Sequence, residues 1–556
     1  MKATTTTTTI LSALVAAALA SSSAPHRRES SSSSSSSSIL EANPNKQSKM
    51  AAVMGLKTSN YQQKQDAGLF DPGRYKVQEA TRCQGGKVGE YSCENVDLLG
   101  HLTHEAMGSQ TRAGNDLWGW THTDGREFAI VGQTDGVAFV EVLKDGSLTY
   151  LGRLPTQTEN AIWRDIKVLG HHAYIVADAY GHGLQVFDLT KLLALNNGNA
   201  SGTAGAGGAG AKPKTFSTLL DLTAWYVGFG SAHNVAVNEE SQTVYVLGAG
   251  KDGLDGACEG LAGGGGSSNS SSSSTSSPSP SPSPSSPASP ASPASPASPA
   301  SPPSSSSEPS SSSNGGLIML DARNPAKPTL TGCAGQDGYV HDALAVTYRG
   351  ADARYHGREI VFGCNEDTLT IYDVTDRAAP LVLSKTTYDG FNGTGAYTHQ
   401  TWPVDGAALT HLLLDDELDE ENRGRTPGGD THTTTYVFDV RDLTAPRWTG
   451  RYTAPVKSVD HNQYVRDGLS YMANYGSGMR VVDVSGVAKG DPQGKTMREV
   501  AHFDCFPDDD AEGGSAEFDG AWTAYPFFAS GTVLLNCIER GVFALKVNRG
   551  STSSTT

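Results

Sequence analysis

Apolar and polar residues alternate with a period of two along most of this chain, in short runs. The runs Leu369–Asp373 and Met479–Asp483 are examples: both contain β-branched residues and both end in Asp. Short alternating runs of this composition predict β-strands rather than helices. Turn residues such as Gly, Asn and Asp separate the runs. The chain is therefore predicted to be almost entirely β.

A longer pattern recurs along the chain. Each copy opens with a polar pair at the start of its first strand. Two further strand-like runs follow, and some copies also show a fourth strand of the Leu-Gly type. Seven pairs are found: Asn115-Asp116, Arg164-Asp165, His233-Asn234, His341-Asp342, His399-Gln400, His461-Asn462 and, more weakly, Asp519-Gly520. Self-similarity at a period of roughly 40–50 residues of strand and turn indicates radially repeated four-stranded sheets. The predicted fold class is an all-β, seven-bladed β-propeller.

The ends of the repeat predict how the ring closes. The last copy ends at Val547 without a fourth strand, whereas Val96–Leu102 matches the fourth strand of the first copy, 148–154. An unpaired outer edge is a liability for a sheet. We therefore expect this N-terminal strand to pair beside 542–547 and complete the seventh blade.

Several stretches resemble a known family. They are 163–168, 181–189, 365–371, 414–420, 460–462 and 525–528. These stretches resemble the choice-of-anchor B family, whose core is built of LVIVD-type repeats, and the resemblance covers about Cys83 to Val547. It implies an extracellular repeat protein with no established activity. The family is named for its varied C-terminal anchors, but the last residues here include no hydrophobic tail, so no membrane or lipid anchor is expected.

Composition divides the chain into segments. Lys2, the apolar run 10–20 and the small residues before Ser21 form a signal-peptide pattern, which predicts secretion to the extracellular space. The Ser-rich and Pro-rich stretches cannot bury a core. The predicted segments are a signal peptide (1–20), a disordered Ser-rich tail (21–60), the propeller (61–547) with disordered low-complexity insertions at 199–212 and 263–313, and a disordered tail (548–556).

Seven cysteines suit an oxidising compartment. We expect Cys83 to pair with Cys93 across a short Gly-rich turn. Further candidate pairs are Cys258 with Cys333 and Cys505 with Cys537, which leaves Cys364 over, although sequence alone does not settle connectivity. Candidate N-glycosylation sites are Asn199, Asn269 and Asn392.

The net charge of −17 excludes the basic face that nucleic-acid binding requires. An acidic surface keeps a secreted protein soluble. No nucleophile elbow, P-loop, dinucleotide fingerprint or zincin motif is found in the sequence. The expected partner is an extracellular protein or glycan, and the expected state is a monomer.

Four consecutive copies open with histidine. His233, His341, His399 and His461 should meet near one mouth of the channel, because the first strand of each blade lines it. With Asp342 and Asp460 nearby, they could bind a divalent metal or serve as an acid–base site. Alternatively, the pairs are architectural and satisfy backbone groups of the next blade. The recurrence of polar pairs with different side chains favours the architectural interpretation.

An acidic segment gives a second candidate site. Asp415, Asp416 and Glu417 begin a run of carboxylates after a predicted strand, on the same face as the histidines. Clustered carboxylates suit a hard cation such as Ca²⁺. A charge run is more commonly a solvated loop. The sequence thus offers two interpretations of this segment.

The tryptophans at the copy openings are predicted to pack between blades rather than to stack on sugars. They are Trp118, Trp120, Trp163, Trp402 and Trp522. The sequence as a whole favours a noncatalytic extracellular binding scaffold. The alternative is a metal-dependent enzyme, a hydrolase or lactonase-like activity, with its site at the channel mouth.

Overall fold

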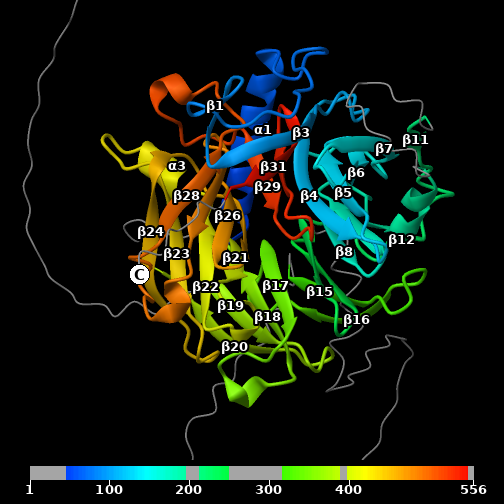
Figure 1. The fold of residues 1–556 in the computed structure, drawn as a ribbon. Helices are drawn as coiled ribbons and strands as arrows, with labels where there is room; N and C mark the ends of the chain where they lie inside the picture. Colours follow the sequence, from blue (N-terminus) through cyan, green and yellow to red (C-terminus); the bar gives the residue numbers. More distant parts are fainter. Residues whose placement is uncertain (1–45, 196–211, 250–315, 389–396, 549–556) are drawn as a thin grey trace, which may run out of the picture. The chain divides into compact units, whose positions relative to one another are not determined.

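Seven four-stranded antiparallel units surround a central axis, which confirms the predicted seven-bladed propeller (Figure 1). The computed structural model describes residues 46–195, 212–249, 316–388 and 397–548. The inner strand of each blade contacts the inner strands of its neighbours around the axis. Residues that occupy the same position in successive copies are therefore brought together around one channel.

Blades 1 to 3 use the strands in chain order. Blade 1 contains β4 (Gly114–Thr121), β5 (Glu127–Gln133), β6 (Gly136–Val142) and β7 (Leu148–Pro155), extended by β11 (Lys214–Thr215); blade 2 contains β8 (Arg164–Leu169), β9 (His172–Ala177), β10 (Leu184–Asp188) and β12 (Ala224–Tyr226); blade 3 contains β13 (Asn234–Asn238), β14 (Thr243–Leu247), β15 (Leu317–Asp321) and β16 (Thr329–Ala334). Strand β14 pairs with β15, so the strands that precede and follow the long Ser/Pro-rich segment in the sequence belong to the same blade.

Blades 4 to 7 complete the ring. Blade 4 contains β17 (Asp342–Thr347), β18 (Glu359–Cys364), β19 (Leu369–Asp373) and β20 (Leu381–Thr386); blade 5 contains β21 (Thr398–Pro403), β22 (His411–Asp416), β23 (His432–Asp439) and β24 (Arg447–Lys457); blade 6 contains β25 (Asn462–Arg466), β26 (Leu469–Ala473), β27 (Met479–Asp483) and β28 (Arg498–Phe503); blade 7 contains β29 (Ala521–Tyr525), β30 (Val533–Cys537), β31 (Gly541–Val547) and β3 (Val96–Leu102). A short helix, α3 (Asp419–Gly424), and the 3-10 turns Leu189–Ala194, Ala353–Tyr355, Gly406–Ala408, Val487–Lys489 and Asp510–Glu512 lie between strands.

The ring closes as the sequence predicts. Strand β3 pairs antiparallel with β31, with Val96 opposite Val547 and Leu102 opposite Val542. In addition, β2 (Tyr91–Glu94) pairs with β28 as a fifth strand of blade 6, and β1 (Lys87–Val88) pairs with β2. The N-terminal segment therefore binds two adjacent blades together.

The cysteine expectations have mixed outcomes. Cys83 and Cys93 form the predicted disulfide, and Cys364 is a buried free thiol as expected. Cys505 and Cys537 are also buried free thiols, so the structure does not contain their predicted disulfide. The reason is geometric: the Cys537 thiol is directed at the backbone oxygen of Cys505, 3.5 Å away.

Other expectations concern residues outside the described ranges. These are Cys258 of the second disulfide candidate, the three sequons at Asn199, Asn269 and Asn392, the signal peptide, most of the insertions 199–212 and 263–313, and the tail after Asn548.

Residues 46–60 depart from the prediction of a disordered tail over 21–60, and residues 61–66 depart from the prediction that the propeller begins at 61. They form helix α1 (Lys46–Asp66), which packs on the propeller (Figure 1). Its packed side chains recur at helical spacing: Met50, Val53, Met54, Lys57, Tyr61 and Lys64. Such spacing places them on one face of the helix. No helix among the described residues is long and apolar enough to span a bilayer.

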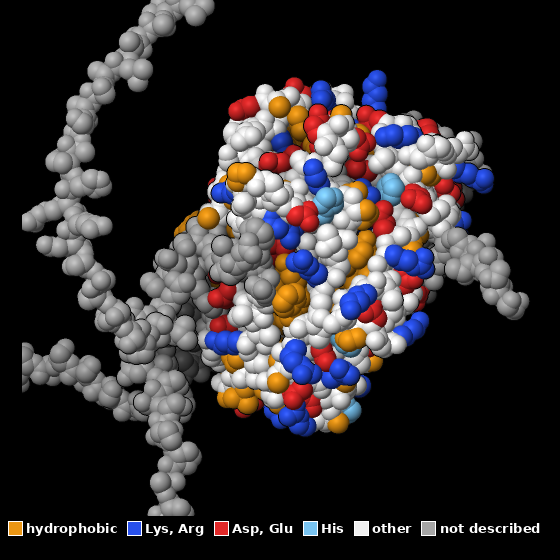
Figure 2. Space-filling view, turned by 90° about the vertical axis from the view of Figure 1, so that its left-hand side faces the viewer, with side chains coloured by type: hydrophobic (Ala, Val, Ile, Leu, Met, Phe, Trp, Pro, Cys, Tyr) orange, Lys and Arg blue, Asp and Glu red, His pale blue; other side chains and the backbone are white. Residues whose placement is uncertain are grey.

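Charged side chains of both signs are interspersed over the face shown in Figure 2. Some exposed side chains of opposite charge form ion pairs, for example Arg354–Asp442 and Arg349–Glu240. Although the chain has more acidic than basic residues, basic side chains lie among the acidic ones on this face.

Candidate ligand site in the axial channel

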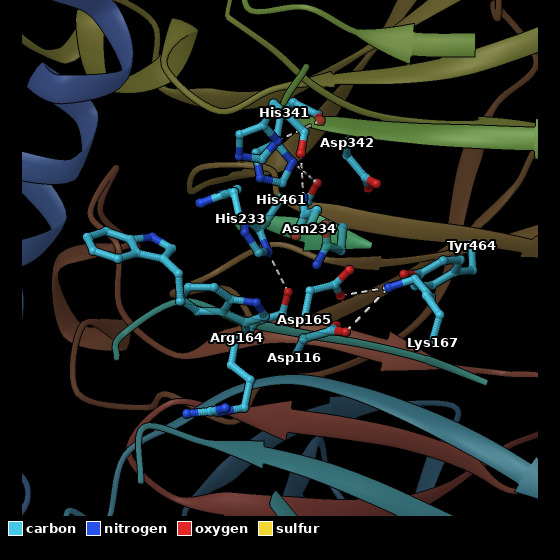
Figure 3. Close-up of a pocket in the computed structure, with 14 residues that line it drawn as sticks. Asp116, Arg164, Asp165, Lys167, His233, Asn234, His341, Asp342, His461 and Tyr464 are labelled. Carbon is cyan, nitrogen blue, oxygen red and sulfur yellow. Dashed lines mark hydrogen bonds and ion pairs between the residues drawn. The ribbon is translucent and has the colours of Figure 1, made fainter. Parts of the chain in front are cut away.

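The polar pairs form successive layers along the channel (Figure 3). The first residues of six pairs share one structural position, at the start of each inner strand: Asn115, Arg164, His233, His341, His399 and His461. Five of these, all but Asn115, line one cavity together with the second residues Asp116, Asp165, Asn234, Asp342 and Asn462. The predicted convergence of the histidines is therefore present in the structure.

The histidine layer joins neighbouring blades. Its ring centroids lie 4.2 Å apart between His341 and His399, and 4.4 Å apart between His399 and His461. Nδ1 of His341 is 3.0 Å from the backbone oxygen of His399, and Nδ1 of His399 is 3.1 Å from that of His461. His461 makes the same contact with Trp522. Burial lowers the pKa of all three imidazoles well below the ordinary value, so they are neutral.

The second layer also has an architectural role. Asp165 accepts a hydrogen bond from the backbone N–H of Val235 at 2.8 Å, and Gln400 accepts one from that of Gln463 at 3.0 Å. Each bond joins an inner strand to the inner strand of the next blade. Asp342 is half-buried, and burial raises the pKa of its carboxyl to about 7. These bonds support the architectural interpretation of the pairs.

Glu417 lies at the centre of the histidine group. Its side chain is 0% exposed, and its Oε1 accepts a hydrogen bond from the Tyr475 hydroxyl at 2.6 Å. The same oxygen is 3.5 Å from His461 Nε2, while Oε2 is 3.8 Å from His399 Nε2. The Lys57 ammonium pairs with Oε1. One carboxylate thus faces several imidazoles and a buried ammonium.

Helix α1 supplies two buried lysines to this end of the channel. Lys57 is 4% exposed, and burial lowers the pKa of its ammonium despite the opposing charge of Glu417. Lys64 pairs with Asp519 at 2.6 Å and with Glu539 at 2.8 Å. In Figure 3 the blue helix beside the histidines is α1. The helix therefore covers this end of the channel.

The acidic segment is buried rather than solvated in its first half. Asp416 accepts a hydrogen bond from the Tyr388 hydroxyl at 2.6 Å, and Asp415 accepts one from Gln463. Asp460 is 1% exposed, and neither of its carboxyl oxygens has a hydrogen-bond donor. Burial raises the pKa of Asp460 well above the ordinary value.

The candidate metal ligands separate into groups. Across the described ranges, one group brings ligand atoms of three His, Cys, Asp or Glu residues within 4.8 Å of one another: His341, His399 and Glu417. His233 instead has its Nδ1 3.2 Å from Asp178. The remaining candidates are not members of this group: Asp342, Asp415, Asp416, Asp460 and His461.

Aromatic residues gather at the other end of the channel. Tyr464 has its ring centroid 5.5 Å from that of Trp118 and 4.8 Å from that of Trp402. Phe527 contacts the same group, and the Lys167 ammonium lies 4.8 Å from the Trp118 ring centroid. We call Trp118, Trp402, Tyr464 and Phe527 the aromatic end.

Exposure increases toward the aromatic end. The histidine layer is buried, whereas Asn234, Asn462, Trp118 and Trp402 are partly exposed. The cavity is thus reached from the side opposite α1. Three of the five tryptophans predicted to pack between blades are buried: Trp120, Trp163 and Trp522. Trp118 and Trp402 also reach solvent, which the expectation of packing did not include.

Sequence reasoning missed Lys57 and Tyr475 as partners of Glu417. The signal for Lys57 was the helical spacing of Met50, Val53 and Met54 before it, which places all four side chains on one face. Tyr475 has no such signal, because its contact depends on how blade 6 meets the end of β22.

No family model matches the chain, and no curated protein matches its sequence. Two solved structures match the chain at low identity. A protein from Lactobacillus plantarum is 12% identical over 76% of this chain and 88% of its own, with a TM-score of 0.39. The periplasmic gluconolactonase of Pseudomonas aeruginosa is 9% identical over 77% of this chain and 98% of its own, with a TM-score of 0.40.

Proposed function

We propose that this chain is a secreted β-propeller of the choice-of-anchor B type that acts as a noncatalytic extracellular binding scaffold. The observation that carries the proposal is the aromatic end, where Trp118 and Trp402 are partly exposed and contact Tyr464, which lines the polar cavity. Aromatic rings with one polar edge are favoured at binding surfaces because they combine apolar area with little conformational freedom.

The ligand class that fits this end is a neutral sugar of an extracellular glycan. Lys167 is balanced by Asp165 at 2.7 Å and Asp116 at 3.5 Å. Arg164, the other cation of the lining, donates to the backbone oxygen of Gln133 at 3.1 Å and to the Thr156 hydroxyl at 2.9 Å. Both cations are engaged within the protein, which disfavours an anionic ligand. The half-buried amides of Asn234 and Asn462 can exchange hydrogen bonds with hydroxyl groups. A sugar ring would place its apolar face on an aromatic side chain and its hydroxyls on these amides.

A glycan-array screen of the full chain tests this function. We expect one glycan class to bind, and a Trp118→Ala, Trp402→Ala double variant to lose that binding. Tyr180→Ala is the matched control, because Tyr180 is an aromatic residue that is 71% exposed outside the channel. Equal loss in the control, or full binding by the double variant, would reject the aromatic end as the contact surface.

A metal-dependent hydrolase or lactonase-like enzyme is the second candidate. One observation favours it: His341, His399 and Glu417 bring three ligand atoms together. A metal held by three protein ligands keeps a coordination position for water or substrate. With Zn²⁺ added, the full chain should hydrolyse a member of a lactone panel, and Glu417→Gln should not. Hydrolysis that survives Glu417→Gln would reject this candidate.

A further inference from the structure

We propose that His341, His399 and Glu417 form a binding site for a divalent transition-metal ion of the zinc class, and that Lys57 of helix α1 competes with that ion. The enzymatic candidate above depends on this site, whereas the scaffold function does not.

The backbone fixes the tautomer of both histidines. Nδ1 of His341 faces the backbone oxygen of His399, and Nδ1 of His399 faces that of His461. A carbonyl oxygen only accepts, so each Nδ1 carries the proton and each Nε2 holds a lone pair. Metal-binding histidines commonly donate their other ring N–H to a backbone carbonyl in this way. Both imidazoles are thus oriented as metal ligands.

Glu417 supplies the anionic ligand. Its Oε2 is buried and has no hydrogen-bond donor, and it lies 3.8 Å from His399 Nε2. A lone pair that faces a carboxylate oxygen in a buried site is unfavourable without a cation between them. Ligand atoms around Zn²⁺ lie about 2.0–2.2 Å from the ion. Ligand atoms around a tetrahedral ion at this distance are about 3.3–3.6 Å apart. The trio, whose ligand atoms lie within 4.8 Å of one another, must therefore contract by up to roughly 1.5 Å on binding.

The donor set selects the class of ion. Two imidazole nitrogens and one carboxylate oxygen suit Zn²⁺ and neighbouring transition metals, whereas Ca²⁺ takes six to eight oxygen ligands. The sequence-based expectation of Ca²⁺ rested on the carboxylates of the 415–421 segment. Asp415 and Asp416 are instead engaged with Gln463 and Tyr388. The structure therefore points to a softer ion at Glu417.

The Lys57 ammonium is the cation that pairs with Glu417 in this structure. It pairs with Oε1 of Glu417 and lies 5.3 Å from the ring centroid of Trp522 and 5.8 Å from that of Tyr475. A bound divalent ion would make two cations share one buried carboxylate, which is costly at low dielectric. Lys57 should therefore weaken metal binding, and metal binding should loosen α1.

The test is calorimetric titration of the metal-free full chain with Zn²⁺ alone, with bound zinc counted after dialysis. Glu417→Gln removes the anionic ligand and keeps its volume. His399→Asn removes Nε2 and retains a donor near Nδ1, because Asn115 in the equivalent position of blade 1 donates to a neighbouring backbone oxygen at 3.0 Å. His432→Asn is the control for zinc captured by a surface histidine, since His432 is 37% exposed.

We expect one Zn²⁺ per chain in the wild type and in His432→Asn, and none at equal concentration in Glu417→Gln or His399→Asn. Lys57→Met should bind at least about tenfold more tightly than the wild type. Circular dichroism identifies any variant that does not fold. Absence of stoichiometric zinc in both the wild type and Lys57→Met, or its retention in Glu417→Gln, would overturn the site. Unchanged affinity in Lys57→Met would overturn the competition.

Discussion

The two nitrogens of each channel histidine serve different purposes. In His341 and His399, Nδ1 holds the next blade through a backbone oxygen, while Nε2 is directed to the buried space around Glu417. The architectural and ligand interpretations of the histidines are therefore compatible. One ring satisfies a buried carbonyl and, in the proposal above, also binds an ion.

The structural part of this role predicts a difference between two variants. His399→Ala removes the donor to His461 and leaves a buried backbone oxygen without a partner, at a cost of about 1–3 kcal/mol. His399→Asn retains a donor, as Asn115 does in blade 1. Urea unfolding should show His399→Ala to be clearly less stable than His399→Asn. Equal stability of the two variants would contradict the assignment of Nδ1 as an inter-blade donor.

For individual residues, the sequence could predict that the histidines converge at the channel, but it could not predict which other side chains they face there. The recurring pairs place His341, His399 and His461 in equivalent positions, so their convergence follows from the repeat. For Glu417, the sequence predicted only that it lies on the same face of the propeller as the histidines. Its pairing with Lys57 depends on a helix that packs across copies of the repeat, and no periodicity within the repeat reports such a contact.

Among the elements, helix α1 is the one that sequence analysis assigned to the wrong class. Residues 46–60 follow a Ser-rich stretch and contain many polar residues, so composition suggested a disordered tail that ends at residue 60. The apolar face is narrow, and two of its positions are Lys57 and Lys64. The helix forms because buried carboxylates of the propeller neutralise these lysines, which is information outside the segment itself.

Lys64 should contribute strongly to stability. Lys64→Met would leave Glu539 buried without its cation, and loss of one partner of a buried pair costs about 3–5 kcal/mol. Thermal unfolding should show a large decrease in Tm for Lys64→Met. The exposed Lys144→Met variant, the control, should melt close to the wild type. Equal melting temperatures for the two variants would mean that the Lys64–Glu539 pair does not stabilise the packing of α1 on the propeller.

The strand that closes the ring carries a pH-sensitive group. His101 in β3 accepts a hydrogen bond at Nδ1 from the Gln78 backbone N–H, 3.1 Å away, and donates from Nε2 to the backbone oxygen of Arg540 at 2.9 Å. His104 donates similarly to Cys537 at 2.9 Å. Burial lowers the pKa of both imidazoles from 6.5 to about 4. Both must remain neutral in the folded protein.

The free energy of unfolding should therefore fall in acid, because the histidines at the closing strand β3 become protonated when the chain unfolds. Below pH 6.5 the unfolded chain binds protons that the folded imidazoles do not, so stability falls between pH 6.5 and about 4. The loss approaches about 3 kcal/mol for each histidine. Urea unfolding from pH 7.5 to 4.5 should show this decrease, and His104→Gln should make it smaller by the share of one imidazole, because His101 still titrates. A pH profile that His104→Gln leaves unchanged would contradict the assignment.

For the whole molecule, the repeat predicted most of the fold. Blade number, strand order and closure by Val96–Leu102 all follow from copies of one pattern, because equivalent sequence adopts equivalent structure. The fifth strand of blade 6 did not follow, since β2 lies outside the repeat. The aromatic end was also missed as an open surface, because exposure depends on how seven inner strands meet at the axis.

The 263–313 insertion should be dispensable for the propeller. Its Gly, Ser and Pro composition offers almost no apolar area to bury, and each doubling of loop length costs only about 0.6 kcal/mol in closure entropy. Because β14 and β15 pair in one blade, a short Gly-Ser turn can replace it. Differential scanning calorimetry should give a nearly unchanged Tm. A large decrease in Tm would mean that the insertion packs on the propeller.

In the proposal above, the closed end of the channel is a metal site shared between the propeller and α1. Anomalous diffraction at the zinc absorption edge, from crystals grown with equimolar Zn²⁺, would locate the ion. We expect one peak bonded to His341 Nε2, His399 Nε2 and Glu417 Oε2 at about 2.0–2.2 Å, with the Lys57 ammonium moved away from Glu417. Peaks confined to surface histidines, with the Lys57–Glu417 pair intact, would contradict it.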